Sequence, residues 1–386
     1  MPDPRSLTPD PRPPIPDPRS PIRVLIVDDS PVVRELLAYI LNSDPGIRVI
    51  GTAGNGEEAL KAIQHEKPDV ITMDIIMPKM DGFETTRTIM ETNPIPIIIV
   101  TGSFNIREVG ISFKATEVGA LTIIQKPRGI GHPSHAKDAR ELIRMVKLMS
   151  EVKVIRRWPD KHRKTPALRR VIENGEKIDE IKLVAIGAST GGPPVIRQIL
   201  SGLPKSFPWP VLIVQHIAEG FIDGFADWLN QSSSLPIHLA AHNAQPMAGH
   251  AYLAPDGRQM QVVMNGRIAL IDDPPENGLR PSVSYLFRSV AHVYGRQAVG
   301  ILLTGMGKDG AAELKLMREK GAVTIVQDQE SSTVFGMPGE AVRLDAARYI
   351  LSPEEIVSLL GNLINEISVF FGGLYGREKT YRGNST

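Results

Sequence analysis

The chain has 386 residues, with 44 Lys and Arg against 43 Asp and Glu, and no cysteine. This length predicts two or three domains, and 42% hydrophobic with 23% charged residues is the composition of a globular protein. The composition excludes a disulfide scaffold, and the near-neutral charge gives no global reason to expect a nucleic-acid partner. Apolar runs fall far short of the ~20 residues that span a bilayer, so we expect no membrane insertion and a cytoplasmic location.

Two stretches differ from the rest in composition. The first 21 residues spell Pro-Asp-Pro-Arg three times, starting at Pro2, Pro9 and Pro16. Such a segment buries too little surface to offset its ordering entropy, so we expect 1–21 to be a disordered extension. The stretch 153–170 holds eight Lys or Arg against one Asp. Without a nucleic-acid-binding motif beside it, this charge favours a solvated basic linker over 146–180.

From Ile22, five apolar runs of strand length alternate with segments of helical period. The runs lie at 22–27, 47–52, 69–73, 97–101 and 121–125. The first helical segment has Ser30 as N-cap and Pro31 in its first turn, and 137–157 has the pattern of a closing amphipathic helix. Five such units predict a doubly wound parallel sheet over 22–145.

A second alternation begins at Lys182. Its strand-like runs lie at 182–186, 211–215, 298–303 and 322–327. Residues 251–271 alternate apolar and polar around Asn265-Gly266, which predicts an antiparallel hairpin on an otherwise parallel sheet. A helix near 353–367 ends the pattern. We therefore predict a second doubly wound, three-layer α/β domain over 181–370, followed by a tail at 371–386.

Charged and hydroxyl side chains follow four strands of the first domain, at the sheet edge where open α/β proteins bind ligands. They are Asp28, Asp29, Asp74, Thr101 and Lys126. Each alone would be interpreted as a helix cap or a turn residue. Together, three converging carboxylates favour bound Mg²⁺, and metal and lysine would spread the charge as Asp74 attacks a phosphoryl donor. Thr101 can then bind the transferred phosphoryl oxygens.

Residues 22 to about 145 resemble the receiver domain of bacterial two-component response regulators. The resemblance is carried by Asp28-Asp29, Met73-Asp74, Met77-Pro-Lys-Met-Asp-Gly82, Thr101 and Lys126-Pro127. It implies that a histidine kinase phosphorylates Asp74, with Mg²⁺ held by Asp28, Asp29, Asp74 and the backbone carbonyl of Ile76. It also implies that Thr101 and Lys126 sense the phosphoryl group.

A glycine-rich turn follows the first strand of the second domain. It reads Gly187-Ala-Ser-Thr-Gly-Gly192 and leads into a helical stripe. A phosphate-binding loop is the weaker interpretation, because neither a Gly-x-Gly-x-x-Gly spacing nor a Gly-Lys-Ser/Thr ending is present. The Gly-x-Ser-x-Gly pattern instead exposes the Ser189 hydroxyl on a sharp turn, although a serine N-cap would look similar.

A nucleophilic serine needs a base and an orienting carboxylate, and strand ends again supply both. His216 follows the run 211–215, and Asp309 lies in the loop after 298–303. The order Ser189, His216, Asp309 differs from the serine, acid, histidine order of α/β-hydrolases. Backbone N–H groups near Met306 or Thr190 are candidate oxyanion donors. Other histidines, including His238, His242 and His250, are interpreted as surface or packing residues.

Residues 182 to about 370 resemble the catalytic domain of chemotaxis protein-glutamate methylesterases of the CheB type. The matching segments are Ala185-Ile-Gly-Ala-Ser-Thr-Gly-Gly192, Gln215-His216, Gly249-His-Ala-Tyr-Leu-Ala-Pro255, Arg280-Pro-Ser-Val283, Leu303-Thr-Gly-Met-Gly-Lys-Asp-Gly310 and Val334-Phe-Gly-Met-Pro338. The resemblance implies a cofactor-free hydrolase that demethylates glutamates and deamidates glutamines on chemoreceptors. Ser189, His216 and Asp309 occupy the family's triad positions, and Met306 supplies an oxyanion donor.

The order of the two domains suggests a hypothesis of control. The unphosphorylated receiver would cover the seryl cleft, and phosphorylation of Asp74 by a chemotaxis histidine kinase would uncover it. The alternative is a phosphate sink or receptor-docking response regulator without hydrolase activity. A DNA-binding output is disfavoured because the second half alternates strands with helices and has no helix-turn-helix pattern.

Overall fold

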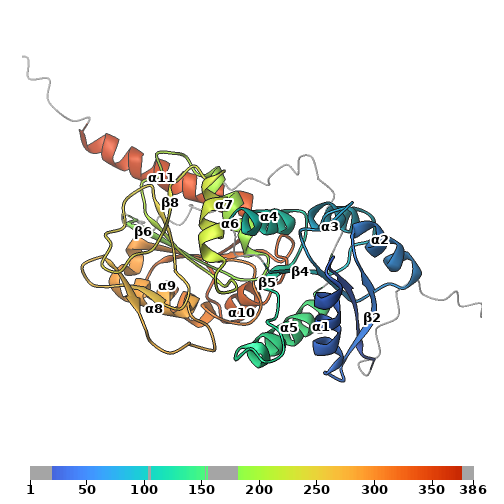
Figure 1. The fold of residues 1–386 in the computed structure, drawn as a ribbon. Coiled ribbons are helices and arrows are strands. Elements are labelled where there is room, and N and C mark those ends of the chain that lie inside the picture. The colour runs from blue at the N-terminus through green and yellow to red at the C-terminus, as the bar shows by residue number, and fades with distance from the viewer. Residues whose placement is uncertain (1–19, 103–105, 153, 155–180, 376–386) are drawn as a thin grey trace, which may run out of the picture.

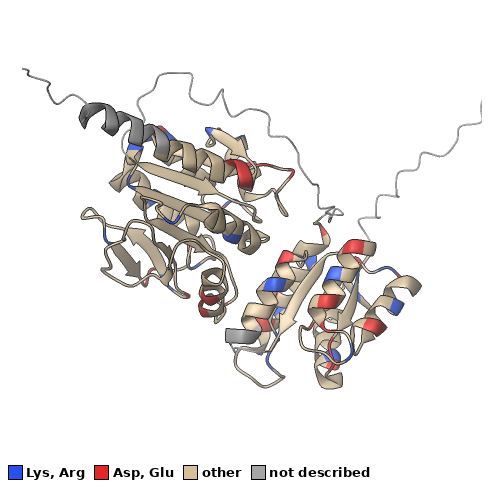
Figure 2. Cartoon of the chain, turned by 90° about the horizontal axis from the view of Figure 1, so that it is seen from above, with Lys and Arg blue, Asp and Glu red and all other residues tan. Residues whose placement is uncertain are grey.

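The computed structural model describes residues 20–102, 106–152, 154 and 181–375. Most of the expected 1–21 extension, most of the 146–180 linker and residues 376–386 of the tail lie outside the described residues. Within the described part, no helix has both the length and the apolarity needed to cross a membrane. Figure 2 shows Lys and Arg interspersed with Asp and Glu along the helices of the first domain, as the near-neutral net charge predicts.

The first domain is a five-stranded, wholly parallel sheet in the order β2-β1-β3-β4-β5, which is the flavodoxin-like order. Its strands are β1 (Ile22–Val27), β2 (Ile47–Ala53), β3 (Val70–Met73), β4 (Ile97–Thr101) and β5 (Thr122–Gln125). Its helices are α1 (Pro31–Asn42), α2 (Gly56–His65), α3 (Gly82–Thr92), α4 (Ile106–Glu117) and α5 (His135–Ser150). The predicted strands and fold class are confirmed.

Local chemistry fixes the helix starts of this domain. The side chains of Ser30, Asn55 and Asp81 each accept a backbone N–H in the first turn of α1, α2 and α3. At the other end of the domain, the prediction that a helix continues to 157 was wrong, because α5 ends at Ser150. Its last buried residue is Met149, and Val152 and Val154 pack against the core beyond the helix.

The second domain is a seven-stranded parallel sheet in the order β14-β13-β12-β6-β7-β9-β8. Its strands are β6 (Leu183–Ala188), β7 (Val211–Gln215), β8 (Ile237–Leu239), β9 (Ala251–Leu253), β12 (Ala298–Leu302), β13 (Val323–Gln327) and β14 (Tyr349–Leu351). Its helices are α6 (Gly192–Gly202), α7 (Ile222–Asn230), α8 (Val283–Val293), the 3₁₀ turn η2 (Gly295–Gln297), α9 (Ala311–Glu319), α10 (Met337–Arg343) and α11 (Pro353–Tyr375). Alternate strand residues belong to two core clusters, with α6, α7 and α11 on one face and α8, α9 and α10 on the other. This is the predicted three-layer arrangement (Figure 1).

The antiparallel hairpin is smaller than the 251–271 stretch predicted to form it. Only β10 (Gln259–Val262) and β11 (Ile268–Ile271) pair antiparallel, and they form a separate two-stranded sheet. Its turn includes Gly266 at φ +77°, as Asn265-Gly266 predicts. The first part of the stretch is β9. It is a buried strand of the main sheet, where it pairs parallel with β7 and β8.

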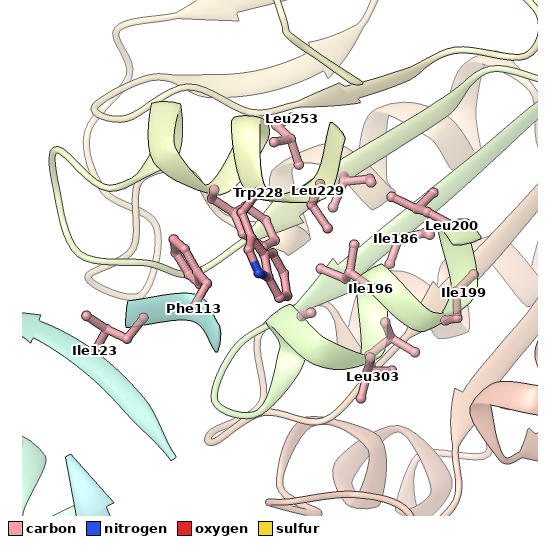
Figure 3. Packing of buried hydrophobic residues seen from close by; sticks show 14 of the residues in the cluster. Phe113, Ile123, Ile186, Ile196, Ile199, Leu200, Trp228, Leu229, Leu253 and Leu303 are labelled. Atoms are coloured by element: carbon pink, nitrogen blue, oxygen red, sulfur yellow. The ribbon is translucent and has the colours of Figure 1, made fainter. Parts of the chain in front are cut away.

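The two domains meet through α4 of the first domain and the helices α6 and α7 of the second (Figure 1). One buried apolar cluster runs through both domains across this contact. Figure 3 shows Phe113 of α4 directed towards Trp228 of α7. The Phe113 ring lies 5.0 Å from that of Phe225 and 5.5 Å from that of Trp228.

Candidate active site and phosphoryl-acceptor site

The acidic residues of the first domain converge where its sheet order reverses, between β1 and β3. Carboxylate oxygens of Asp28, Asp29 and Asp74 all lie within 4.8 Å of one another. Lys126 Nζ lies 2.8 Å from Asp28 Oδ2 and 2.8 Å from Asp74 Oδ2. Thr101 ends β4 and is buried, and its carbonyl accepts the Lys126 backbone N–H at 2.8 Å. The structure therefore brings these predicted residues to one edge.

The electrostatics of this edge suit a hard cation. Burial raises the pKa of Asp74, and the neighbouring Asp28 adds to that effect, while Lys126 opposes it. The Asp28 and Asp74 carboxylates in turn raise the pKa of Lys126, overcoming its burial. An all-oxygen donor set of three clustered carboxylates fits Mg²⁺, which would offset their mutual repulsion. Ile76 lies two residues after Asp74 with an exposed side chain.

The loop after β3 is folded tightly back on the acceptor. Gly82 N–H donates to the Ile75 carbonyl at 2.9 Å, and a Cβ at Gly82 would lie 1.9 Å from the Asp74 carbonyl oxygen. Only glycine fits this approach. The preceding Asp81 caps α3, so the segment that carries the receiver resemblance also fixes the backbone beside Asp74.

In the second domain, Ser189 follows β6 on a turn that requires glycine. Ser189 N–H donates to the Thr304 carbonyl at 3.0 Å, which fastens the turn to the end of β12. Gly191 has φ +76°, and a Cβ there would lie 2.4 Å from Thr333. A Cβ at Gly305 would lie 2.7 Å from Ser189 Cβ, so the loop leading to Met306 passes directly against the serine.

His216 and Asp309 form a buried pair. His216 Nε2 lies 2.9 Å from Asp309 Oδ2, and because a carboxylate only accepts, Nε2 carries the proton. The Nδ1 atom of His216 is then left as an acceptor for a serine hydroxyl. Ser189 and His216 line the same cavity. No hydrogen bond joins Ser189 Oγ to His216 among the described residues, and such bonds commonly tighten only in the substrate complex.

Hydrogen-bond donors at the start of α8, which the sequence analysis did not identify, hold the Asp309 carboxylate. Ser282 Oγ and Ser284 N–H donate to Oδ1 at 2.8 and 3.1 Å, and Val283 N–H donates to Oδ2 at 2.6 Å. Burial alone would raise the pKa of Asp309, but the hydrogen bonds from His216, Ser284 and Ser282 outweigh it and lower the pKa to about 2. The carboxylate is therefore ionised throughout the physiological range. The segment Arg280-Pro-Ser-Val283 was a family marker, yet nothing in the sequence pairs it with Asp309.

The two candidate oxyanion donors lie on the loops that flank Ser189. The backbone N–H groups of Met306 and Thr190 donate to no described residue, which leaves both available to a ligand. His238, His242 and His250 have partners outside the Ser-His-Asp set. His238 Nε2 lies 2.8 Å from His250 Nδ1 with the two rings stacked, and His242 Nδ1 approaches the Leu270 carbonyl at 3.2 Å.

The fold and the two sites define a response regulator whose receiver domain is joined to an α/β domain with a Ser, His and Asp set. Two family models match, the response regulator receiver domain over 24–132 and CheB methylesterase over 184–360. The chain belongs to the CheB family of protein-glutamate methylesterases/protein-glutamine glutaminases.

Relatives named protein-glutamate methylesterase/protein-glutamine glutaminase match nearly end to end. The protein from Nitrosospira multiformis is 56% identical over 89% of this chain and 98% of its own. A protein of Geobacter metallireducens is 54% identical over 89% of this chain and 99% of its own. A protein of Syntrophus aciditrophicus is 54% identical over 90% of this chain and 99% of its own.

Proposed function

We propose that this chain is a phosphorylation-controlled serine hydrolase acting on chemoreceptors in the cytoplasm. It hydrolyses glutamate methyl esters with release of methanol and deamidates glutamines with release of ammonia. The observation that carries the proposal is one cavity lined by both Ser189 and His216, with Asp309 hydrogen-bonded to the imidazole and receiver residues completing the wall. The end-to-end likeness to relatives named for both activities supports the substrate class.

The chemistry follows from the geometry. Ser189 Oγ attacks the side-chain carbonyl carbon, and its proton passes to His216 Nδ1 while Asp309 stabilises the imidazolium through Nε2. Backbone N–H groups of Met306 and Thr190 stabilise the oxyanion. Collapse of the tetrahedral intermediate breaks the C–O or C–N bond, and the leaving methoxide or amide takes the proton from His216. Water then attacks the acyl-serine by the same route and yields the glutamate carboxylate.

The receiver domain supplies the control. Asp74 accepts a phosphoryl group from a chemotaxis histidine kinase, and Thr101 and Lys126 bind its oxygens. Asp28, Asp29, Asp74 and the backbone carbonyl of Ile76 would hold Mg²⁺. The ion would neutralise charge during transfer. The hydrolytic site uses side chains and backbone groups alone.

The receiver leaves no room for substrate in this arrangement. Phe113 and Thr116 of α4, with Leu121, Thr122 and Ile123 around the start of β5, complete the wall of the seryl cavity. Its volume is about 20 Å³. That is space for about one water molecule, whereas ligand pockets measure roughly 300–1,000 Å³. We interpret this arrangement as the inactive state, in which the receiver covers the nucleophile.

Helix α4 links the phosphoryl-acceptor site to this cover. It begins shortly after Thr101, spans about 18 Å at 1.5 Å per residue, and ends at Glu117 beside the catalytic domain. Glu117 forms an ion pair with Arg197, whose guanidinium lies 4.9 Å from the centre of the Trp228 ring. A shift of α4 on phosphorylation would disturb these contacts. Tenfold activation requires only about 1.4 kcal/mol of differential stability between covered and open states.

The test is methanol release from methylated receptor membranes, with and without acetyl phosphate and Mg²⁺. We expect Ser189→Ala to abolish release in both conditions. We expect Asp74→Asn to retain the unstimulated rate and lose the stimulation. If release from cognate receptors does not depend on Ser189, the hydrolase proposal fails, and the phosphate-sink or receptor-docking alternative takes its place.

A further inference from the structure

We infer that three buried glutamines, Gln215, Gln259 and Gln327, are positioning residues for the Ser-His-Asp set, each fixing a different part of it. Gln215 is 3% exposed, and the other two are 0% exposed. A buried primary amide can hold two segments in fixed relation, either by donating at one end and accepting at the other, as in Gln259 and Gln327, or by donating both N–H groups, as in Gln215, whose Oε1 has no hydrogen-bond partner in the described part of the chain. The inference rests on the proposed hydrolytic function.

Gln215 ends β7 and joins the nucleophile to the base. Its Nε2 donates to the Ser189 carbonyl at 2.9 Å and to the His216 carbonyl at 2.8 Å. Both partners only accept, so the orientation of the amide is fixed by them. Its Oε1 lies where a side chain at Gly192 would be, since a Cβ there would approach to 2.2 Å. The glycine therefore makes room for the amide that holds the two residues together.

Gln327 ends β13 and fixes the loop that carries the oxyanion donor. Its Oε1 accepts the Thr304 N–H at 2.8 Å, and its Nε2 donates to Ser331 Oγ at 3.1 Å. Thr304 in turn accepts the Ser189 N–H through its carbonyl and donates from its hydroxyl to the Thr190 carbonyl at 2.9 Å. The position of Ser189 relative to Met306 thus depends on this amide.

Gln259 begins β10 and positions Ser282, which donates a hydrogen bond to Asp309. Its Oε1 accepts the Ser282 N–H at 2.9 Å, and its Nε2 donates to the Leu279 carbonyl at 3.1 Å. Ser282 Oγ then donates to Asp309 Oδ1 at 2.8 Å. The three amides together reach all three members of the set.

A role in folding alone would make these glutamines equivalent to any other buried polar group of the domain. Thr324 is such a group. It lies at the opposite end of β13 from Gln327, is buried, and accepts the Arg348 N–H through its hydroxyl at 3.1 Å. Thr324→Val therefore removes a buried hydroxyl acceptor from the same strand without touching the Ser-His-Asp set, while the Arg348 N–H still donates to the Thr324 carbonyl at 3.0 Å. It serves as the control for loss of a buried polar group.

The experiment uses the full chain, activated with acetyl phosphate and Mg²⁺, and compares wild type, Thr324→Val and each glutamine replaced by methionine. Measured quantities are kcat and KM for methanol release, the thermal midpoint, and the rate at which a fluorophosphonate labels Ser189. Because small displacements of reacting groups are costly, we expect each Gln→Met variant to lose about 10- to 100-fold in kcat and in labelling rate. KM should stay within about twofold, since substrate contacts are unchanged. Thr324→Val should keep wild-type kcat.

A rescue pair separates positioning from folding. Gln327→Glu keeps an acceptor for the Thr304 N–H but loses the donation to Ser331 Oγ, whose hydroxyl already donates to Asp328 Oδ1 at 2.5 Å. It should therefore recover part of the activity lost in Gln327→Met. Gln215→Glu sets a carboxylate against two carbonyls and should not recover activity. Folded Gln→Met variants with the kcat and labelling rate of Thr324→Val would overturn the inference. A wild type that is labelled but releases no methanol would refute the proposed function, while the labelling rates still decide the role of the glutamines.

Discussion

In the receiver domain, two buried carboxylates, Asp28 and Asp74, share one cation, the ammonium of Lys126. In the catalytic domain, the single carboxylate of Asp309 is surrounded by two hydroxyl or backbone donors from Ser282 and Ser284, the Val283 N–H and one imidazole. The first site carries surplus negative charge that a bound cation would complete. The second is satisfied by neutral donors and has its protonation state fixed without any ion.

Both sites lie at the carboxyl edge of a parallel sheet, but only one is open. Around Asp74, the neighbouring Asp29 and Ile76 are exposed, so a phosphodonor can approach. Around Ser189, the receiver completes the cavity wall. Under the proposed function, this contrast means that control acts on access to a catalytic site whose side chains are already in place, whereas the acceptor site is completed only when its ligands bind.

Neutralising Asp309 should have the largest effect, because it removes the fixed charge that distinguishes the second site. Asp309→Asn keeps the size of the side chain but disturbs the His216 tautomer, and the comparable change in serine protease triads costs about 10⁴-fold in kcat. We expect a loss of about 10³- to 10⁴-fold in methanol release, with KM little changed. Asp272→Asn, an exposed carboxylate paired with Arg258, is the control and should keep full activity. Activity within tenfold of wild type would contradict the assignment of Asp309.

The same residue should give the catalytic domain an acid-dependent stability. The pKa of Asp309 is about 2 when folded, against 3.8 ordinarily, so its stabilisation is present above about pH 4 and is lost as the pH falls towards 2. The shift corresponds to about 2 kcal/mol. Denaturant unfolding, followed by tryptophan fluorescence to which Trp209 and Trp228 of the catalytic domain contribute, should show wild type losing about that much more than Asp309→Asn between pH 5 and pH 2. Equal losses would mean that His216, Ser284 and Ser282 do not lower the pKa of Asp309 in the folded state.

Strand-end reasoning from the sequence identified most residues of the two candidate sites that the structure brings together. Long buried runs alternating with helical stripes identify the parallel strands, and the residues after them converge because carboxyl ends of such strands share an edge. In this way Asp28, Asp74, Ser189, His216 and Asp309 were found. The short strand β14 has three residues, too few for a periodicity to be recognised.

Contacts set by tertiary packing could not be predicted. Ser282 is 27 residues from Asp309 in the chain, and no local pattern links them. Gln215 lies at the end of a strand, where polar residues are common. Only the structure shows that its amide is buried and donates to the Ser189 and His216 carbonyls. The contact of Phe113 with Phe225 and Trp228 likewise joins residues of two domains that lie more than a hundred positions apart in the chain. Side-chain partners across domains are fixed by shape, which a linear pattern does not contain.

Uncovering the catalytic site should raise activity without phosphorylation. Phe113→Ala removes the ring that packs on Phe225 and Trp228, so the covered state loses apolar contact that the open state does not have. We expect the rate without phosphodonor to rise about tenfold, corresponding to about 1.4 kcal/mol, and the stimulation by acetyl phosphate to shrink. Phe83→Ala on α3, outside the wall of the seryl cavity, is the control for loss of a receiver ring. An unstimulated rate equal to that of the control would refute the covering role of α4.

The smallest effect should come from the partly exposed ion pair between Glu117 and Arg197. Such pairs contribute about 0–1 kcal/mol, so Glu117→Gln should raise the unstimulated rate by at most about fivefold. The increase should diminish as salt is added, because ions screen the pair in wild type. Arg197→Met should raise the rate by a similar amount, since its cation–π contact with Trp228 lies within the catalytic domain and does not hold the receiver. Glu91→Gln, which breaks an exposed pair with Arg87 on α3, should change neither rate. If Glu117→Gln lowers the unstimulated rate instead, the pair stabilises the open state, and the cover is held by apolar packing alone.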